Sequence, residues 1–250
     1  MYQFKNLFGF LFMALALTVF VSCDDDDDVT PQPEPQNIAQ IAAADGQFST
    51  LVSALDRVGL VSVLEGSGPF TVFAPTNDAF TALGVDLSTI SDEALTEILL
   101  YHVIGANIAS TDLADGKTYS GTAAAGPNDN PLSILIEKSA SGVKVNNVAN
   151  VTTADVEATN GVIHIVDAVI TPLNVVGHAA ANDDLSSLVS TIGAASGDLA
   201  TVLSGDGPFT VFAPVNSAFD AIADVTAGLT ADQLATVLTY HVVAGNVLST

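Results

Sequence analysis

Positive charge and cysteine are both scarce in this chain. Of its 250 residues, 5 are Lys or Arg and 28 are Asp or Glu, so the formal net charge is -23. A protein this acidic repels a phosphate backbone and an anionic lipid surface, which excludes nucleic acid as a partner. Cys23 is the only cysteine, so an intramolecular disulfide is excluded and stability must come from the apolar cores.

The chain also has no tryptophan, and aromatic residues make up only 6 % of it. This scarcity counts against a sugar site built on aromatic stacking. By contrast, 49 % of the residues are apolar and only 13 % are charged, which indicates a folded chain rather than a disordered one. The length allows one large domain or two ordinary ones.

The N-terminus has the pattern of an export signal. Lys5 is the only charge before the apolar residues 7–21, a stretch that is short for a membrane-spanning helix. Residues 20–23, FVSC, resemble the lipobox of bacterial lipoproteins. We therefore predict a lipoprotein signal peptide over residues 1–22, lipidation of Cys23, and an exported protein anchored at the cell envelope, at a bacterial outer membrane or cell surface. An uncleaved anchor helix is the alternative, and it would also tether the chain to a membrane.

The segment after Cys23 is predicted to be an extended tether. Residues 24–28 are consecutive aspartates, and residues 29–35 contain prolines at alternate positions. Like charges repel each other and Pro prevents both helix formation and central-strand pairing, so residues 23–36 read as an acidic, Pro-rich spacer. Loose calcium binding by the carboxylates is a weaker alternative, because no Gly turn or spaced ligand loop accompanies them.

The rest of the chain contains an internal repeat. Residues 68–75, GPFTVFAP, recur letter for letter as residues 207–214, an offset of 139 positions. The Tyr-His pair at 101–102 returns at the same offset, at 240–241. A period this long indicates tandem domains rather than a solenoid, whose repeats are roughly 20 to 50 residues long.

We predict two domains from this repeat: copy one, residues 37–173, and copy two, residues 175–250. Copy two contains no counterpart of residues 112–172. We therefore expect copy two to be incomplete, with unpaired strand edges and bare apolar surface.

Helices are expected early in copy one and strands late. Apolar residues recur at helical spacing between Phe48 and Val58, and residues 70–74 form a short apolar run, typical of a buried strand, that ends at Pro75. Residues 132–136, 143–145 and 161–171 have strand character and are separated by Gly and Asn turns. Helices followed by strands indicate an α+β domain.

Several residues are suited to helix starts. Ser91 can cap a helix, and Thr230 with Gln233 forms a capping box for the counterpart helix in copy two. Asn77 and Asn216 stand at the start of short helices, where we expect their side chains to cap free backbone amides.

Three motifs in copy one resemble the fasciclin, or FAS1, family. They are residues 71–80, TVFAPTNDAF, residues 160–167, NGVIHIVD, and the Tyr-His pair between them. Copy two repeats the first motif and the pair. The resemblance implies a wedge-shaped α+β fold with helices packed on a β-sandwich-like sheet core, in two tandem copies with the second truncated. It also implies an extracellular setting and a role in attachment to cells, matrix or surface polymers.

The resemblance further implies contact residues. In animal members of the family, the Tyr-His pair and an Asp-Ile pair before the second signature are implicated in receptor binding. Here Ala154 and Glu157 stand where those members carry Pro and Met, which argues against an integrin-type contact. The candidate adhesion residues are Tyr101, His102, Asp155, Val156, Tyr240 and His241.

The histidines also permit a purely structural interpretation. His102 lies seven and three residues after Leu95 and Leu99, so its ring falls on the apolar face near a helix end, and His241 has the same setting. His164 shares a strand face with valines on either side. Packed, hydrogen-bonded core histidines are therefore favoured over ligand contacts.

No chemistry-bearing motif stands out. The histidines are scattered, no cysteine accompanies them, and no nucleophile has a base at an informative spacing, so we predict no enzyme activity, no metal and no cofactor. The predicted function is adhesion to an extracellular protein or polysaccharide. One alternative is a glycan-binding or small-molecule-binding module, which predicts an apolar pocket with a few polar groups. Another is an envelope enzyme, which predicts a cleft holding a residue with a shifted pKa.

Overall fold

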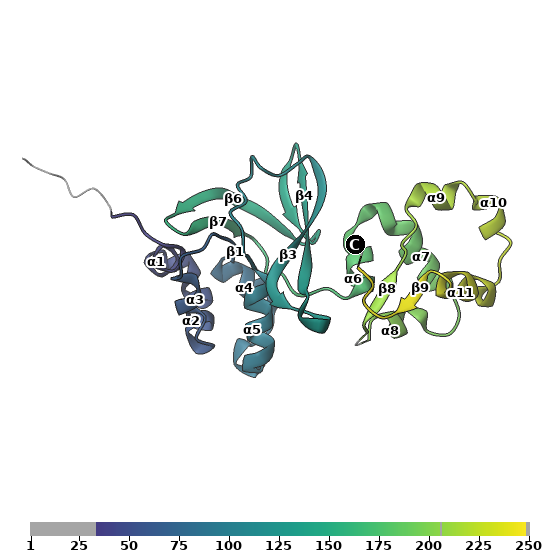
Figure 1. Cartoon of the computed structure of the whole chain (residues 1–250), viewed down its shortest axis with the longest axis horizontal. Coiled ribbons are helices and arrows are strands. Elements are labelled where there is room, and N and C mark those ends of the chain that lie inside the picture. Colours follow the sequence, from purple (N-terminus) through teal and green to yellow (C-terminus); the bar gives the residue numbers. More distant parts are fainter. Residues whose placement is uncertain (1–33, 206, 249–250) are drawn as a thin grey trace, which may run out of the picture. The chain divides into compact units, whose positions relative to one another are not determined.

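The computed structural model describes residues 34–205 and 207–248, whose elements follow the sequence repeat (Figure 1). The predicted signal peptide, Cys23 and nearly all of the predicted tether lie outside these residues. Within the described part of the chain, no helix combines the length and the apolar character needed to cross a membrane.

Copy one begins with a layer of short helices. Its first helix starts with a capping box, in which the Asn37 side chain accepts from the backbone of Gln40 and the Gln40 side chain accepts from the backbone of Asn37. The apolar pattern from Phe48 onward becomes a helix that buries Leu51 and Leu55, as predicted. The helical elements of this copy are α1 (Ile38–Ala44), η1 (Gly46–Phe48), α2 (Ser49–Arg57), α3 (Val61–Leu64), α4 (Asn77–Leu83), η2 (Leu87–Thr89) and α5 (Asp92–Tyr101), with the short η3 (Pro127–Asp129) between two strands.

The strands of copy one form one seven-stranded sheet in the order β2-β1-β7-β6-β5-β4-β3. β1 and β7 are parallel, and every other neighbouring pair is antiparallel. The strands are β1 (Phe70–Pro75), β2 (Val103–Ile104), β3 (Gly116–Ala125), β4 (Pro131–Ser139), β5 (Gly142–Val145), β6 (Ala149–Ala158) and β7 (Gly161–Val166). Five of them follow the helical layer in sequence, which confirms the α+β prediction.

Two apolar cores hold copy one together. The helix core packs α1 to α5 against β1 and β7, and its members include Leu51, Leu95 and Ile163. The sheet core combines side chains from β1 to β7, including Phe73, with Tyr101 at the end of α5. β7 was predicted to run on to residue 171 but ends at Val166, because the apolar residues beyond it leave the sheet and are buried in the cores without strand pairing.

Copy two repeats the helical layer and one strand pair. Thr210 is opposite Val243 in β8 and β9, as Thr71 is opposite Ile104 in β1 and β2. Its elements are α6 (Val175–Ala181), η4 (Asp183–Leu185), α7 (Ser186–Ala194), α8 (Leu199–Leu203), β8 (Phe209–Val211), α9 (Asn216–Asp220), α10 (Ala223–Thr226), α11 (Ala231–Thr239) and β9 (Val242–Ala244). The sequence repeat is therefore a repeat of structure.

The predicted helix caps are confirmed in two cases. Ser91 accepts from the backbone amide of Ala94 at the start of α5, and Thr230 forms a capping box with Gln233 at the start of α11.

The prediction that Asn77 and Asn216 cap their helices is wrong. Thr76 caps α4 instead, and the residue before α9, Val215, makes no side-chain cap. Both asparagines are the first residue inside a helix, and their amide groups reach across to a different element. Their side chains therefore join elements that are distant in sequence.

Candidate functional site

Tyr101 is a core residue of copy one. Its side chain is 0 % exposed, and its hydroxyl donates to the carbonyl of Ser133 over 2.6 Å and accepts from Nδ2 of Asn146 over 3.1 Å. This hydrogen-bonded position between α5, β4 and the turn after β5 favours a packing role. Tyr101 presents no side-chain surface to a partner.

His102 is buried beside it at the end of α5. Its Nε2 accepts the backbone N–H of Ile170 over 2.9 Å, so the ring proton is on Nδ1, which donates to the carbonyl of Ile98 over 2.7 Å. Burial lowers the pKa of His102 to about 4, although the bond to Ile98 acts in the opposite direction. The ring is neutral near pH 7 and joins a helix end to the segment after β7, as the structural interpretation predicts.

The counterpart pair in copy two has a different environment. Tyr240 is 92 % exposed, whereas His241 is partly buried and its Nδ1 lies 2.8 Å from the carbonyl oxygen of Val237. Phe212 of the same copy is 60 % exposed, while its counterpart Phe73 is only 2 % exposed. Copy two therefore presents at its surface several side chains that copy one buries.

Asp155 and Val156 lie at an irregularity in β6, and both are partly exposed. Asp155 has a positive φ of 58°, which Asp tolerates better than most residues. Its backbone N–H donates to Nδ1 of His164 over 3.3 Å, and its carboxylate accepts from the backbone N–H of Ser110 over 2.7 Å and from the Ser110 hydroxyl. These hydrogen bonds from Ser110 lower the pKa of Asp155.

Asp155 therefore connects a loop to the sheet and also faces a surface hollow. The hollow has a volume of about 290 Å³ and is lined by Asn107, Asp155, Glu157 and apolar neighbours. Of the six candidate contact residues, Asp155 and Val156 are the ones in copy one that reach the surface. Ser110 was missed as the partner of Asp155, because it lies 45 residues earlier and no local pattern relates the two residues.

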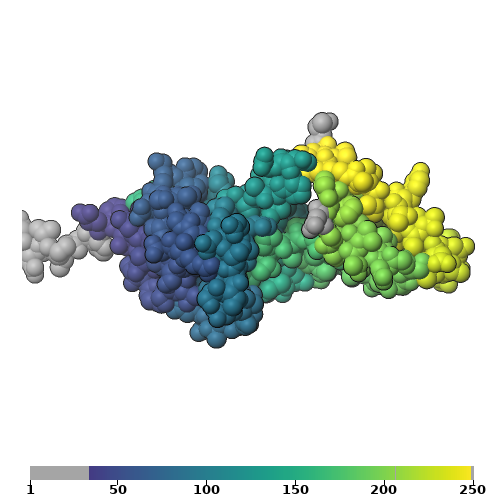
Figure 2. Space-filling view, turned by 90° about the horizontal axis from the view of Figure 1, so that it is seen from below, coloured from purple at the N-terminus to yellow at the C-terminus, as the bar shows by residue number. Residues whose placement is uncertain are grey.

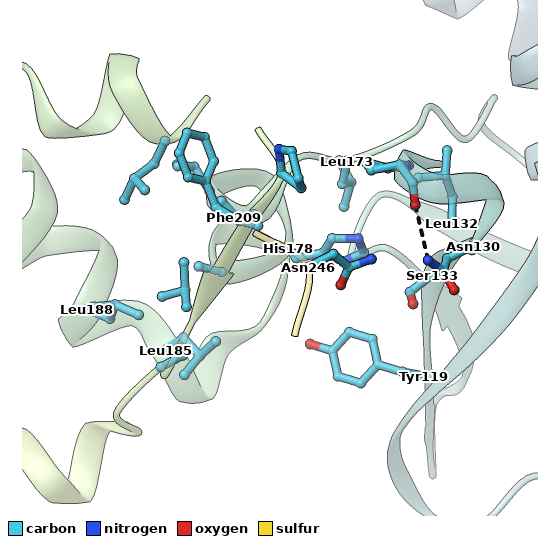
Figure 3. A pocket seen from close by; sticks show the side chains of 18 of the residues that line it. Tyr119, Asn130, Leu132, Ser133, Leu173, His178, Leu185, Leu188, Phe209 and Asn246 are labelled. Atoms are coloured by element: carbon cyan, nitrogen blue, oxygen red, sulfur yellow. Dashed lines mark hydrogen bonds between the residues drawn. The ribbon is translucent and has the colours of Figure 1, made fainter. Parts of the chain in front are cut away.

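A larger cavity lies where residues of the two copies meet. Its volume is about 410 Å³, and Figure 3 shows Tyr119 and Leu132 of copy one on one side and Leu185, Leu188 and Phe209 of copy two on the other. The teal surface of this part of copy one adjoins the green start of copy two in Figure 2. No sequence pattern predicts this cavity, because it combines residues from both copies.

The polar groups around the cavity are few. Nδ1 of His178 is buried and has no hydrogen-bond partner among the described residues, and burial lowers the pKa of this ring. The Tyr119 ring lies edge-on to His178 with centroids 6.0 Å apart, and its hydroxyl accepts from Asn182 over 3.2 Å. Lys117 and Asp184 form an ion pair at 3.0 Å between the copies. The cavity is thus mainly apolar with a few polar groups.

The four basic side chains of the described residues all have partners. Arg57 pairs with Asp92, Lys117 with Asp184, and the two remaining lysines bond neutral oxygens: Lys138 the carbonyl of Leu113 and Lys144 the side chain of Asn147. Across residues 34–205 and 207–248, no group of three or more His, Cys, Asp or Glu is placed to hold a metal ion.

Comparison with known proteins matches both copies of the repeat to a single family model. The family model described as the Fasciclin domain matches residues 46–172 and 183–250. The chain is 41 % identical over 140 residues to Protein sll1483 of Synechocystis sp., covering 54 % of this chain and 73 % of that protein. It is 33 % identical over 174 residues to human periostin, covering 67 % of this chain but only 20 % of periostin.

A solved FAS1 domain pair from the insect cell adhesion molecule Fasciclin I is also similar. The TM-score is 0.43 at 19 % sequence identity, and the match covers 77 % of this chain and 68 % of that one.

Proposed function

Because this chain belongs to the fasciclin domain family, we propose that it is an exported adhesion protein that attaches its cell to an extracellular protein or a surface polysaccharide. The observation that carries the proposal is the family match over both copies, at residues 46–172 and 183–250. The role in attachment is the one that the fasciclin motifs imply.

The contact surface that we propose in copy one is centred on Asp155 and Val156. These residues are partly exposed beside a surface hollow, whereas Tyr101 and His102 are buried and would act only by maintaining the fold. In copy two, Tyr240 and His241 remain candidates because they reach the surface.

Charge narrows the class of partner. The net charge is -23, and copy two contains no Lys or Arg at all. All four bases of the described residues already bond to groups within the chain. A neutral or cationic partner is therefore favoured, and strongly anionic polymers would be repelled.

An attachment assay tests the proposal. Beads coated with the purified chain are passed under flow over surfaces carrying matrix protein, neutral polysaccharide or anionic polysaccharide. We expect retention on matrix protein or neutral polysaccharide, and several-fold lower retention for Asp155→Asn. Absence of retention on every surface would overturn the adhesion proposal.

Two variants control for charge and for folding. Asp56→Asn removes the same charge from an exposed position on α2. Ser110→Ala removes the hydroxyl bond to the Asp155 carboxylate but keeps the backbone N–H bond and the charge. Retention should fall most for Asp155→Asn. An equal fall for Asp56→Asn would show a general effect of charge and would remove Asp155 from the contact.

The lipid anchor is a separate part of the proposal and has its own test. Lipidation at Cys23 should make the protein partition into the detergent-rich phase of a cloud-point extraction, and Cys23→Ala should move it to the aqueous phase. A variant protein that still partitions with detergent would support an uncleaved anchor helix instead.

The cavity between the copies has the character that a small-molecule-binding module predicts. However, its walls in copy two are the counterparts of side chains that form the helix core of copy one, such as Leu51 for Leu188 and Phe70 for Phe209. This correspondence favours a packing role for these side chains, so the small-molecule function stays the second candidate.

A further inference from the structure

A second surface hollow of copy one lies beside the bond between Ser110 and Asp155. Its volume is about 340 Å³, at the lower end of the roughly 300–1,000 Å³ that small-molecule sites occupy. Its lining comes from the loop after β2, from the hairpin of β4 and β5, and from the first half of β6 (Figure 1). We call it the Lys138 hollow, after the only charged residue among those that line it, and it shares no lining residue with the hollow at Asp155.

Lys138 offers hydrogen-bond donors to this hollow. Its Nζ donates to the carbonyl of Leu113 over 2.9 Å, and no carboxylate of residues 34–205 and 207–248 forms an ion pair with it. An ammonium group carries three donors, so two of them remain for a ligand. Hydrogen bonds from a charged donor are about twice as strong as those between neutral groups.

Two hydroxyl groups of the lining offer acceptors instead. Ser110 donates its hydroxyl proton to the Asp155 carboxylate, and Thr152 donates its own to the carbonyl of Ile165 over 3.2 Å. A hydroxyl has one proton and two lone pairs, so both residues can only accept from a ligand. A ligand that fits the hollow must therefore accept from Lys138 and also donate to the two hydroxyls. Sugar hydroxyl groups do both, whereas a carboxylate can only accept.

The rest of the lining is mainly aliphatic. Val143, Val151 and Ala154 give the hollow apolar surface. The C–H face of a sugar ring gains free energy by leaving water for such a surface. This contact needs no aromatic side chain, which agrees with the scarcity of aromatic residues in the chain.

We propose that the Lys138 hollow binds one neutral hexose unit of a surface polysaccharide. Lys138 donates to ring hydroxyls, Ser110 and Thr152 accept from them, and the aliphatic side chains pack against the C–H face of the ring. The inference rests on the proposed adhesion function and names the unit that the protein recognises. Uronate units are disfavoured, because their carboxylate meets the lone pairs of the two hydroxyls and the net charge of -23.

Titration of the purified full chain with single sugars tests the hollow. Glucose, galactose and mannose are added in turn, each beside its uronate, and the amide resonances of Lys138 and Thr152 are followed by nuclear magnetic resonance. We expect at least one hexose to shift both resonances saturably, and its uronate to bind at least fivefold more weakly. The absence of a shift with all three hexoses would overturn the inference, and so would a uronate that binds as tightly as its hexose.

Two lysine variants separate the site from a general effect of charge. Lys138→Met keeps an aliphatic side chain but removes the donors, so the hexose should bind at least tenfold more weakly, the scale of a hydrogen bond from a charged group. Lys144→Met removes the same charge from β5, at a residue that does not line the hollow, and should leave the affinity unchanged. An equal loss of affinity in both variants would contradict the proposed site.

A hydroxyl variant tests the hollow independently of charge. Thr152→Val keeps the shape of the side chain but removes its acceptor, and the hexose should bind about fivefold more weakly, the usual scale of one lost hydrogen bond. Thr153→Val is the control, because Thr153 is an exposed residue of the same strand that does not line the hollow. The melting temperature of each variant shows whether it is folded. Unchanged affinity in folded Thr152→Val would remove this residue and the donor requirement from the proposal.

Retention of coated beads distinguishes a failure of this site from a failure of the adhesion proposal. Lys138→Met should lower retention on neutral polysaccharide several-fold and leave retention on matrix protein unchanged. Full retention of Lys138→Met on neutral polysaccharide would overturn the hollow as the polysaccharide contact but leave adhesion standing. Saturable hexose binding without retention on any surface would instead overturn adhesion and leave a sugar-binding module.

Discussion

The amide of Asn77 fastens the start of α4 to the start of α2: its Oδ1 accepts the backbone N–H of Thr50 over 2.9 Å, and its Nδ2 donates to the carbonyl of Gly46 over 2.9 Å. Asn216 makes the same two bonds in copy two, with the N–H of Ser187 and the carbonyl of Asp183. The clamp satisfies a backbone N–H that the start of a helix leaves without an intrahelical partner, and it adds a second hydrogen bond to a carbonyl that already accepts one from the backbone. An amide suits this position because its oxygen accepts while its nitrogen donates.

Replacing Asn77 should therefore destabilise copy one. Asn77→Ala leaves the backbone N–H of Thr50 without its partner and removes one of the two hydrogen bonds to the carbonyl of Gly46, so we expect the free energy of unfolding to fall by about 1–3 kcal/mol. Asn77→Asp keeps the acceptor but sets a carboxylate against the carbonyl of Gly46, so it should not restore stability. Urea denaturation followed by far-ultraviolet circular dichroism measures both. Asp78→Ala, an exposed neighbour in the same helix turn, is the control and should cost only a few tenths of a kcal/mol.

Tyr101 and Tyr240 are counterparts in the two copies, but only the side chain of Tyr101 is buried. The pair therefore tests how much a buried tyrosine hydroxyl contributes to stability. Tyr101→Phe removes the bond to Ser133 and leaves the buried Nδ2 of Asn146 without its partner, so we expect a loss of about 1–3 kcal/mol. Tyr240→Phe changes a side chain that is 92 % exposed and should leave stability unchanged. A retained denaturation midpoint for Tyr101→Phe would show that water or another group satisfies Asn146.

Structural features that depend only on residues close to one another in sequence could be predicted from the sequence. The Ser91 cap and the Thr230 box depend on residues three apart, and the burial of His102 follows from apolar residues at helical spacing. The repeat could also be read directly, because an identical octapeptide at a constant offset specifies the same local fold twice.

Structural features that depend on contacts between elements distant in sequence could not be predicted from the sequence. Asn77 has the composition of a helix cap, but its partner Thr50 lies 27 residues earlier, so its clamp depends on how α2 and α4 pack. The positive φ of Asp155 and its bonds to Ser110 depend on the irregular pairing of β6 with β7. The apolar period of β7 continues past Val166, although the pairing stops there.

Gly161 is required by close backbone contact. A Cβ on this residue would lie 1.9 Å from the carbonyl oxygen of Phe70, and its φ of 153° is one that side chains rarely adopt. Gly161→Ala should therefore push β7 away from β1 and cost several kcal/mol, enough to lower the yield of folded protein. Gly142→Ala is the control: its φ of 121° is also unfavourable, but its Cβ would meet nothing within 4 Å. The melting temperature of Gly161→Ala should be clearly the lower of the two.

The buried ring of His102 should make the stability of copy one depend on pH. Burial lowers its pKa in the folded chain from 6.5 to about 4. Above pH 6.5 the ring is neutral in both states and contributes nothing to the pH dependence. Between pH 6.5 and 4 the unfolded chain binds a proton that the folded chain does not, so the free energy of unfolding falls as the pH falls. The full loss is roughly 3 kcal/mol, since one pKa unit corresponds to about 1.4 kcal/mol.

Unfolding curves at several pH values between 7 and 4 measure this dependence, and His102→Gln should flatten it even though the variant is less stable at pH 7. The carboxylates with lowered pKa, such as Asp155, keep their stabilising charge in this window, because that contribution is lost only as the pH falls below the ordinary range near 3.8. Asn77→Ala serves as the control, since it should lower stability by the same amount at every pH and leave the slope unchanged. A slope that persists in His102→Gln would place the titrating group elsewhere, and His178, whose pKa burial also lowers, would be the next ring to replace.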